Sequence, residues 1–420
     1  MTRSLIVRAA VGVALIVVAN AADAQRVTLP DKHPAVGAML DTLRAANAWT
    51  VGEQISICEI PAPPFKEQTR AEELRRRFAA LGLRDPRIDG EGNVIAERPG
   101  AGGGPTVVVS GHLDTVFPEG TDVSVKREGT RLSAPGIADD CRGLAVLLAM
   151  ARALDVAKVR TRGTLIFVGT VGEEGAGNLR GVRHLVDSSL ARRMDYFISV
   201  DGGGRTMTAR AVGSHRYRVT VSGPGGHSFG DFGRPSATHA LGRAIARIAV
   251  LRVPPSPKTT FNVGAITGGT SVNAIAERAT MEIDLRSESP VALDSLDAAF
   301  RQALASALAE ENARSSNADI RLTARIDTIG IRPTGTQADS ARIVRVGLEA
   351  ARLLGFDQRT HSQSTDANYP MSRGIPAIAI DGGGRSANAH SLTEWYDDGP
   401  DGWRGPQWAA LIALTLAGVR

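Results

Sequence analysis

Short, continuously apolar runs that alternate with helical stretches constrain the fold of this chain more than any other feature. An apolar run with no alternating polar residues is typical of a strand buried on both faces, as in a parallel sheet covered by helices. Two stretches between the runs, 142–157 and 177–190, have the apolar spacing of helices. The sequence therefore predicts an α/β domain with a mainly parallel central sheet. The predicted strands are 93–97 (NVIAE), 106–111 (TVVVSG), 164–170 (TLIFVGT) and 196–200 (YFISV).

The hydrophobic pattern changes after residue 212. Several later runs alternate apolar and polar residues, which indicates strands with one solvent-exposed face. Together with two helical stretches they predict a smaller α+β layer of four strands and two helices, with a ferredoxin-like arrangement. The predicted elements are the strands 216–223, 259–267, 278–288 and 320–326, a helix after Pro235 and a helix at 292–311.

After this insertion the first pattern resumes, so the larger domain is predicted to be discontinuous. A helix at 340–354, a strand at 375–381 and a final helix from Gln407 complete it. The expected segments are a signal peptide at 1–24, the first part of the larger domain at 25–212, the inserted domain at 213–326 and the second part at 327–420.

The N-terminus resembles a cleaved secretory signal. Arg3 and Arg8 stand before and within the start of an apolar run, which closes on the small-residue pattern Ala22-Asp23-Ala24. No later stretch approaches the roughly 18 uninterrupted apolar residues of a membrane span. An uncleaved N-terminal anchor is the alternative. We expect a secreted or periplasmic protein that has no membrane contact after signal cleavage.

The composition argues against a nucleic-acid partner and against a disulfide-framed fold. The formal net charge is only +5, Lys and Arg are scattered, and aromatic residues make up 4% of the chain, so no platform for stacking bases is indicated. Cys58 and Cys141 are the two cysteines. An oxidising compartment would permit one bond between them, but we expect two buried free thiols.

Histidines and acidic residues follow the ends of the predicted strands. In an open α/β sheet, sites form outside the carboxyl ends of the strands. Carboxylates gathered there would repel each other strongly unless a cation neutralised them. Histidine with carboxylates suits zinc or a related divalent ion, and a carboxylate shared between two ions would make a paired-metal site. The residues are His112, Asp114, Asp139, Asp140, Glu173, Glu174, Asp201 and His390.

Each of these signals has an ordinary alternative. The pair His112 and Asp114 could be a surface pair, the two glutamates a solvated turn, and Asp140 the N-cap of the helix that follows it. In an extended segment, however, His112 and Asp114 share one face. The Asp114 carboxylate could therefore orient the imidazole while a metal takes the other ring nitrogen. The ordered set is much more specific than any one member.

That ordered set, His-x-Asp, Asp-Asp, Glu-Glu, Asp and His, resembles the M20 metallopeptidases and amidohydrolases, which include tripeptidase T and carboxypeptidase G-type enzymes. The resemblance runs from 60–67 (IPAPPFKE) to 382–395 (GGGRSANAHSLTEW). It implies a zinc-exopeptidase-like catalytic domain with an inserted dimerisation or lid domain. It also implies two zinc ions, replaceable by Co²⁺ or Mn²⁺. His112 and Asp201 would bind one ion, Glu174 and His390 the other, and Asp139 would bridge both.

The resemblance implies further roles within the catalytic domain. Glu173 would be the general base and then the general acid, Asp114 would support His112, and the Asp139–Asp140 peptide bond would be cis. Zinc lowers the pKa of bound water, so Glu173 could take a proton from it and pass that proton to the leaving nitrogen. The family often has Lys or Gly where this chain has Cys141 and Arg142, a departure that leaves the bridging aspartate in place.

In the inserted domain, His227 of the segment GPGGHSFG matches the family histidine that reaches the active site, usually of the partner subunit, to stabilise the oxyanion. A homodimer is implied. Asn273 and Arg286 match positions that hold the carboxylate or backbone of the substrate, and the planar fork of arginine suits a carboxylate. A surface-loop histidine and an ordinary ion pair of Arg286 are the alternatives. Ala276 replaces a common proline of the family, which leaves the shape of this loop open.

These features predict an exported di-zinc exopeptidase that acts on short peptides. An N-acyl-amino-acid amidohydrolase or a glutamate-type carboxypeptidase could use the same residues, and an inactive relative that binds peptides is a remote alternative. Export favours the scavenging of extracellular peptides over a biosynthetic role such as desuccinylation, and the VDGGG segment at Asp201 resembles the tripeptidase branch. The segment 175–181 (GAGNLRG) is not a dinucleotide loop, because its glycine spacing is wrong and Glu173 and Glu174 would repel a pyrophosphate.

Overall fold

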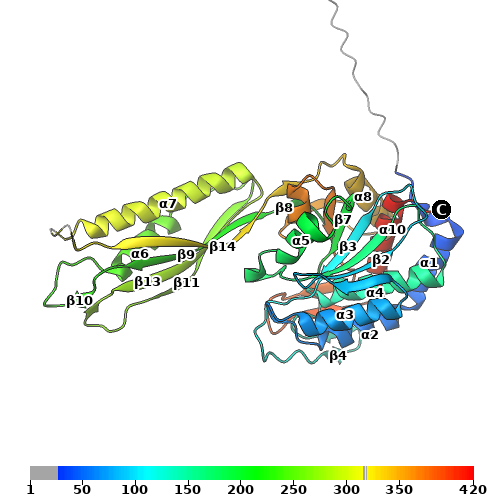
Figure 1. The fold of residues 1–420 in the computed structure, drawn as a ribbon, viewed down its shortest axis with the longest axis horizontal. Helices are drawn as coiled ribbons and strands as arrows, with labels where there is room; N and C mark the ends of the chain where they lie inside the picture. The colour runs from blue at the N-terminus through cyan, green and yellow to red at the C-terminus, as the bar shows by residue number, and fades with distance from the viewer. Residues whose placement is uncertain (1–26, 316, 318) are drawn as a thin grey trace, which may run out of the picture.

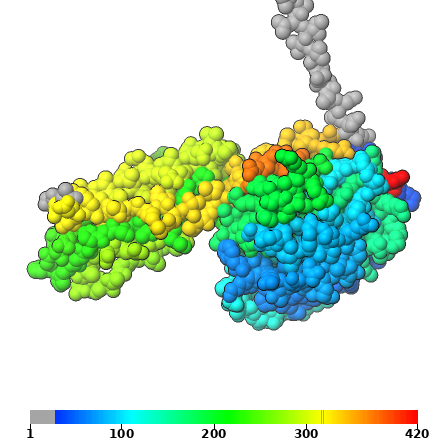
Figure 2. All heavy atoms as spheres, in the orientation of Figure 1, coloured from blue at the N-terminus to red at the C-terminus, as the bar shows by residue number. Residues whose placement is uncertain are grey.

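The computed structural model describes residues 27–315, 317 and 319–420, and the predicted signal peptide lies outside them. The chain forms two lobes (Figures 1 and 2). The larger lobe contains both the first and the last parts of the described chain, and the smaller lobe contains the middle part, as predicted for an inserted domain. Among the described residues, no helix is long and apolar enough to cross a membrane.

A nine-stranded sheet forms the centre of the larger lobe. Four neighbouring strands, β6, β3, β7 and β17, run parallel to one another. The pairs outside them, apart from β8 with β16, are antiparallel, so the sheet is parallel at its centre and mixed as a whole. The strand order is β1 (Arg84–Ile88), β2 (Val94–Arg98), β6 (Leu165–Thr170), β3 (Val107–His112), β7 (Tyr196–Val200), β17 (Ala377–Ile380), β8 (Met207–Ala211) and β15 (Gly335–Thr336), and β16 (Thr360–Gln363) also pairs with β8.

Both faces of this sheet are buried, as the continuous apolar runs predict. Val107 and Val109 of β3 belong to one hydrophobic cluster, whereas Val108 between them belongs to another. The first cluster lies under six helices, and the second under shorter helical segments. The six helices are α1 (Pro34–Ala45), α2 (Asn47–Cys58), α3 (Gln68–Ala80), α4 (Cys141–Val156), α8 (Arg342–Leu354) and α10 (Arg404–Ala417), and the shorter ones include α5 (Arg180–His184) and α9 (Asn368–Ser372).

The smaller lobe is a four-stranded antiparallel sheet with two helices, in the order β11 (Thr259–Gly268), β13 (Arg278–Ser287), β9 (Gly213–Ser222) and β14 (Thr323–Arg332). The helices α6 (Ala237–Ala249) and α7 (Pro290–Asn312) pack on it and share its hydrophobic core. Strand β14 continues beyond the predicted strand 320–326. A register shift between Thr328 and Gly330 interrupts the alternation that would have indicated this continuation.

The prediction of two free thiols is wrong, because Cys58 and Cys141 form a disulfide with a Cα–Cα distance of 5.4 Å. Cys58 is the last residue of α2, and Cys141 is the first residue of α4. The two helices pack against each other and bring the cysteines together across 83 residues of sequence. No local pattern reports such a long-range packing contact, so the sequence left the pairing open.

Candidate metal centre

The predicted metal residues gather at the carboxyl ends of the central parallel strands. His112 ends β3, Glu173 and Glu174 follow β6, and Asp201 follows β7. The Nε2 atom of His112 lies 2.8 Å from Oδ1 of Asp139 and 3.9 Å from Oδ1 of Asp201. The parallel strands therefore bring side chains that are far apart in sequence to one edge of the sheet.

Asp139 faces two histidines. While its Oδ1 is close to His112, its Oδ2 lies 3.2 Å from Nε2 of His390, which in turn lies 2.8 Å from Oε1 of Glu174. Potential ligand atoms within 4.8 Å of one another thus form two groups of three that share Asp139. One group is His112, Asp139 and Asp201, and the other is Asp139, Glu174 and His390.

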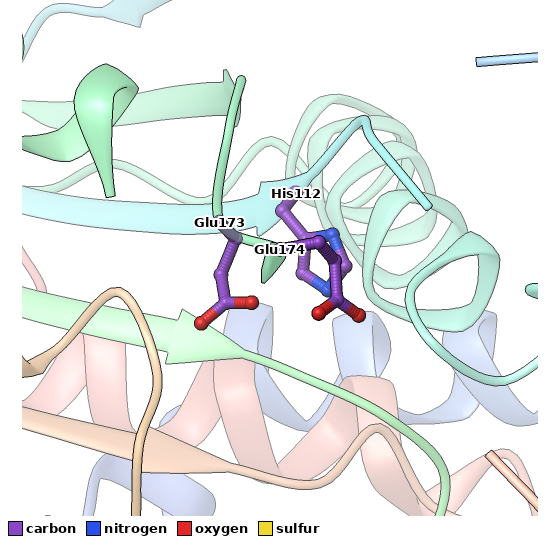
Figure 3. A group of neighbouring side chains, drawn as sticks. All are labelled: His112, Glu173 and Glu174. Carbon is purple, nitrogen blue, oxygen red and sulfur yellow. The ribbon is translucent and has the colours of Figure 1, made fainter. Parts of the chain in front are cut away.

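This donor set fits a pair of divalent cations. Each group offers one imidazole nitrogen and two carboxylates, a combination that suits zinc and related ions. A third group of His112, Glu173 and Glu174 overlaps the other two, and Figure 3 shows both glutamates beside the His112 ring. Because this group shares His112 with the first group and Glu174 with the second, Glu173 lies next to both metal groups. A molecule held between the two groups would be within its reach.

The charges of this cluster depend strongly on one another. Burial opposes a charged His112, but its hydrogen bond to Asp139 and the nearby carboxylates raise its pKa well above the usual value. Hydrogen bonds to Asp139 and Glu174 raise the pKa of His390 to about 10. Burial raises the pKa of Asp201 well above its usual value. A cation in each group would offset the carboxylate charge that the protonated histidines otherwise offset.

Asp140 ties together the segments that carry the first group. Its carboxylate accepts hydrogen bonds from the backbone amides of His112 at 2.9 Å, Gly143 at 2.9 Å and Gly202 at 3.1 Å. The bond to Gly143 makes Asp140 the N-cap of α4, as its position in the sequence predicts. The Asp139–Asp140 peptide bond is cis, which agrees with the family resemblance.

Asp114 lies beside His112, but its carboxylate has a different partner from the one expected. The Nδ1 atom of His112 lies 3.0 Å from the backbone oxygen of Asp114 and 3.7 Å from its carboxylate. The carboxylate instead accepts the amides of Glu173 at 3.1 Å and Glu174 at 2.8 Å. Asp114 thus holds both the imidazole and the glutamate turn. The spacing of the motif predicted the proximity, but it could not show which oxygen faces the ring.

Arg332, the last residue of β14, contacts the proposed base and had no signal in the sequence. It is buried, and its Nη1 donates to Oε1 of Glu173 at 2.9 Å and to Oγ of Ser364 at 3.1 Å. Its Nη2 also donates to the backbone oxygen of Glu173. Burial raises the pKa of Glu173, and the charge of Arg332 acts against this shift. The contact joins the end of the smaller lobe to the glutamate turn.

Glu394 holds the loop that carries Asp139. Its buried carboxylate accepts the backbone amides of Gly136 at 2.9 Å, Ala138 at 2.8 Å and Asp139 at 3.0 Å. Glu394 stands four residues after His390 in the same segment, which is the only signal in the sequence that could have singled it out.

A cavity of about 540 Å³ opens onto the metal groups and is lined by both lobes. Asp139, Glu174 and His390 line one side. The other side includes three basic residues of the smaller lobe, Arg216, Lys258 and Arg286. The Nε of Arg286 donates to Oδ2 of Asp284 at 2.6 Å, and the side chain is partly exposed. Glu288 of the smaller lobe lines the cavity with them, and Arg216 also pairs with Asp284 at 3.2 Å, so the basic residues lie among carboxylates.

His227 and Asn273 lie together, but away from this cavity. His227 belongs to the short strand β10 (Gly226–His227), which pairs with β12 (Ala274–Ile275), and the amide of Ser228 donates to the backbone oxygen of Asn273 at 2.9 Å. Both residues are exposed, and neither lines the cavity. Figure 1 places β10 at the end of the smaller lobe that is remote from the larger lobe. A single chain does not bring them to its own metal groups.

The chain is similar to proteins of one peptidase family. The sequence model described as "Peptidase family M20/M25/M40" matches residues 108–404. The chain is 25% identical to the uncharacterized protein YqjE of Bacillus subtilis over 78% of this chain and 88% of that protein. It is 28% identical to carboxypeptidase G2 of Pseudomonas sp. over 68% of each chain. Its fold resembles the crystal structure of aminopeptidase PepT from Bacillus cereus, with a TM-score of 0.71, 21% identity and coverage of 90% of this chain and 100% of the other.

Proposed function

This chain belongs to peptidase family M20/M25/M40 and is a metal-dependent hydrolase, and we propose that it is an exported di-zinc exopeptidase that cleaves amide bonds of short peptides. The observation that carries the proposal is the position of Asp139. One of its oxygens faces His112, the other faces His390, and Glu173 stands beside the same cluster. This arrangement suits hydrolysis at a pair of divalent ions.

The five proposed ligands divide into two sets. His112, Asp139 and Asp201 would hold one ion, and Asp139, Glu174 and His390 would hold the other. Zinc suits nitrogen and carboxylate ligands, and Co²⁺ or Mn²⁺ could take its place. Bound there, the ions would supply Lewis-acid chemistry, polarising the carbonyl of the scissile bond and lowering the pKa of water.

Glu173 would move the proton. Its carboxylate would take a proton from the attacking water and later give it to the leaving nitrogen. Arg332 donates a hydrogen bond to one of its carboxylate oxygens, and its backbone amide donates to Asp114, so both the side chain and the backbone of Glu173 are held in place. Burial that raises the pKa of Glu173 suits a group that must accept a proton and then release it.

The proposed enzyme works as a homodimer. His227 would reach the active site of the partner subunit and stabilise the oxyanion, and Asn273 beside it would contact the substrate. Support comes from their shared position: both are exposed, they are adjacent to each other, and they are remote from the cavity of their own chain.

Export is proposed from two independent features. The first is the signal-like sequence at 1–24. The second is the disulfide between Cys58 and Cys141, since such bonds persist in oxidising compartments and are rare in the cytosol. Together they favour the periplasm or the extracellular space.

A glutamate-type carboxypeptidase is the second candidate function. Arg216, Lys258 and Arg286, which line the cavity, could bind a substrate that carries a carboxylate close to the scissile bond. The similarity to carboxypeptidase G2 supports the same alternative. An N-acyl-amino-acid amidohydrolase would use the same metal groups.

The test is mass spectrometry of a defined mixture of short free and N-acylated peptides, incubated with the zinc-loaded protein and with a chelator-treated sample. Loss of residues from one terminus of the free peptides, stopped by the chelator, is expected. The matched control is Glu173→Gln, which should retain its zinc and lose at least about 100-fold in kcat. Cleavage of N-acylated substrates alone would replace the peptidase by an amidohydrolase, and full activity of Glu173→Gln would contradict the role of that residue.

A further inference from the structure

We propose that the Cys58–Cys141 disulfide is a positioning element of the metal centre, and that its closure sets how tightly the group of His112, Asp139 and Asp201 binds its ion. The inference rests on the proposed metal site. It assigns a role to Cys141, one of the residues at which the chain departs from the pattern of its family.

The disulfide lies directly behind the loop that carries Asp139. Cys141 follows Asp140 in sequence and begins α4, so only one residue separates the sulfur-bearing position from Asp139. Both cysteines are fully buried. The bond therefore fixes the start of α4 to the end of α2 at the point where the loop enters the helix.

Asp140 transmits the position of Cys141 to one of the two metal groups. Its carboxylate accepts the amides of His112 and Gly202, and Gly202 follows Asp201. A shift of the first turn of α4 would move this carboxylate, and with it the backbone of all three members of the first group. Glu174 is held differently, through the bond of its amide to Asp114. The second group shares only Asp139 with the first, so the effect should be larger on the first group.

Helix α2 contacts the same loop at a second point. Nε2 of Gln54 donates to the backbone oxygen of Ile137 at 2.8 Å. Nη1 of the buried Arg70 donates to the backbone oxygen of Leu113 at 2.8 Å, and its Nη2 donates to that of Cys58 at 3.2 Å. The end of α2, the Asp139 loop and the end of β3 are thus connected by hydrogen bonds, and the disulfide links α2 covalently to the start of α4.

The bond forms by thiol–disulfide exchange with a protein or small-molecule disulfide. The two thiols lose two protons and two electrons as their sulfurs join, and the incoming disulfide takes up both and becomes two thiols. A chain that remains in a reducing compartment would keep two thiols and would bind its first ion more weakly. Tight metal binding would then follow oxidation.

The experiment compares zinc affinity with the bond closed, open and absent. The full chain is purified with free thiols, titrated with zinc against a chromophoric chelator, then oxidised with oxidised glutathione and titrated again. Cys58→Ala/Cys141→Ala is titrated alongside, and thiols are counted after denaturation. Because partners that orient metal ligands typically contribute 10- to 100-fold in affinity, one of the two zinc sites should weaken by about 10- to 100-fold in the thiol form and in the double variant.

Val344→Ala is the matched control, since it removes buried atoms from α8 in the same core without touching the loop. It should lower the thermal midpoint and leave both zinc affinities unchanged. Equal affinities of the thiol and disulfide forms would overturn the inference while leaving the proposed function intact. Equal weakening of both zinc sites would overturn it as well, by pointing to general destabilisation. An oxidised chain that binds no zinc would overturn the proposed function itself.

Discussion

At the scale of single residues, the centre depends on carboxylates with more than one partner. Asp139 faces two histidines, Asp140 accepts three amides, and Asp114 accepts two. A carboxylate has about four acceptor positions, so it can connect several backbone segments at once. This is why short loops with little regular structure can hold the ligand atoms in place.

His112→Ala should remove one ion and leave the other. The remaining group of Asp139, Glu174 and His390 keeps its imidazole, so we expect zinc content to fall from about two ions per chain to about one, with activity at least about 100-fold lower. Metal analysis after gel filtration measures the first effect. His239→Ala, at an exposed histidine, is the control and should keep both ions. A His112→Ala protein with two zinc ions would contradict the assignment.

Asp381 should make stability depend on pH. Burial raises its pKa from 3.8 to about 6, so the folded chain holds this proton more tightly than the unfolded chain. The stability due to this group is therefore complete below about pH 4 and is lost as the pH rises to about 6, by at most about 3 kcal/mol. Urea unfolding between pH 4 and 7 should show this slope in the wild type and less of it in Asp381→Asn. Equal slopes in the two proteins would contradict the shift.

At the scale of elements, the strand ends could be predicted and the connections between lobes could not. β3, β6 and β7 lie within a residue of their predicted ends, because buried strands have a strong and continuous apolar signal. β8 and β16 were not predicted, since Thr208 and Arg210 interrupt one run and the other contains polar residues only. Arg332 and the disulfide had no local signal, because both depend on packing between distant segments.

The start of α4 should tolerate almost no added volume. A Cβ on Gly143 would clash with the Asp140 carboxylate and with the backbone oxygen of Val200. Gly143→Ala should therefore destabilise the fold by about 1–3 kcal/mol and weaken zinc binding, as measured by chemical unfolding and by zinc titration.

Gly242→Ala is the matched control for Gly143→Ala. Gly242 lies in the exposed part of α6, and nothing stands within 4 Å of an added Cβ. Because alanine is the better helix former, the control should stabilise the chain by about 0.5–1 kcal/mol. Equal effects of the two substitutions would show that crowding at Asp140 is not important.

At the scale of the whole molecule, the sequence predicted a discontinuous larger domain and also predicted which residues meet at the edge of its sheet. It succeeded because parallel strands place their carboxyl ends together, whatever their separation in sequence. The distance between the metal groups and His227 could not be predicted in the same way. It depends on how far the smaller lobe extends from the larger one, which is a property of the complete chain.

Mixing two inactive variants should restore activity if His227 acts in the partner subunit. His227→Ala lacks the proposed oxyanion donor, and Glu173→Gln lacks the proposed base. A mixed dimer contains one complete site, so random re-association should recover about a quarter of wild-type activity in a symmetric dimer. Light scattering would establish the dimer, and a peptide assay before and after mixing would measure the recovery. Failure to recover activity in verified mixed dimers would contradict the role of His227.

The division of the larger lobe between two distant parts of the chain has a consequence during biosynthesis. A nascent chain that has emerged as far as Arg332 already contains His112, Asp139, Glu174 and Asp201, but it still lacks β17, His390 and Glu394. The second metal group and the hydrogen bonds of Glu394 to the Asp139 loop therefore form only after the segment up to Glu394 has left the ribosome. A chain synthesised only as far as Arg332 would therefore lack one of the two candidate metal groups, and hydrolysis would have to await the segment that carries His390 and Glu394.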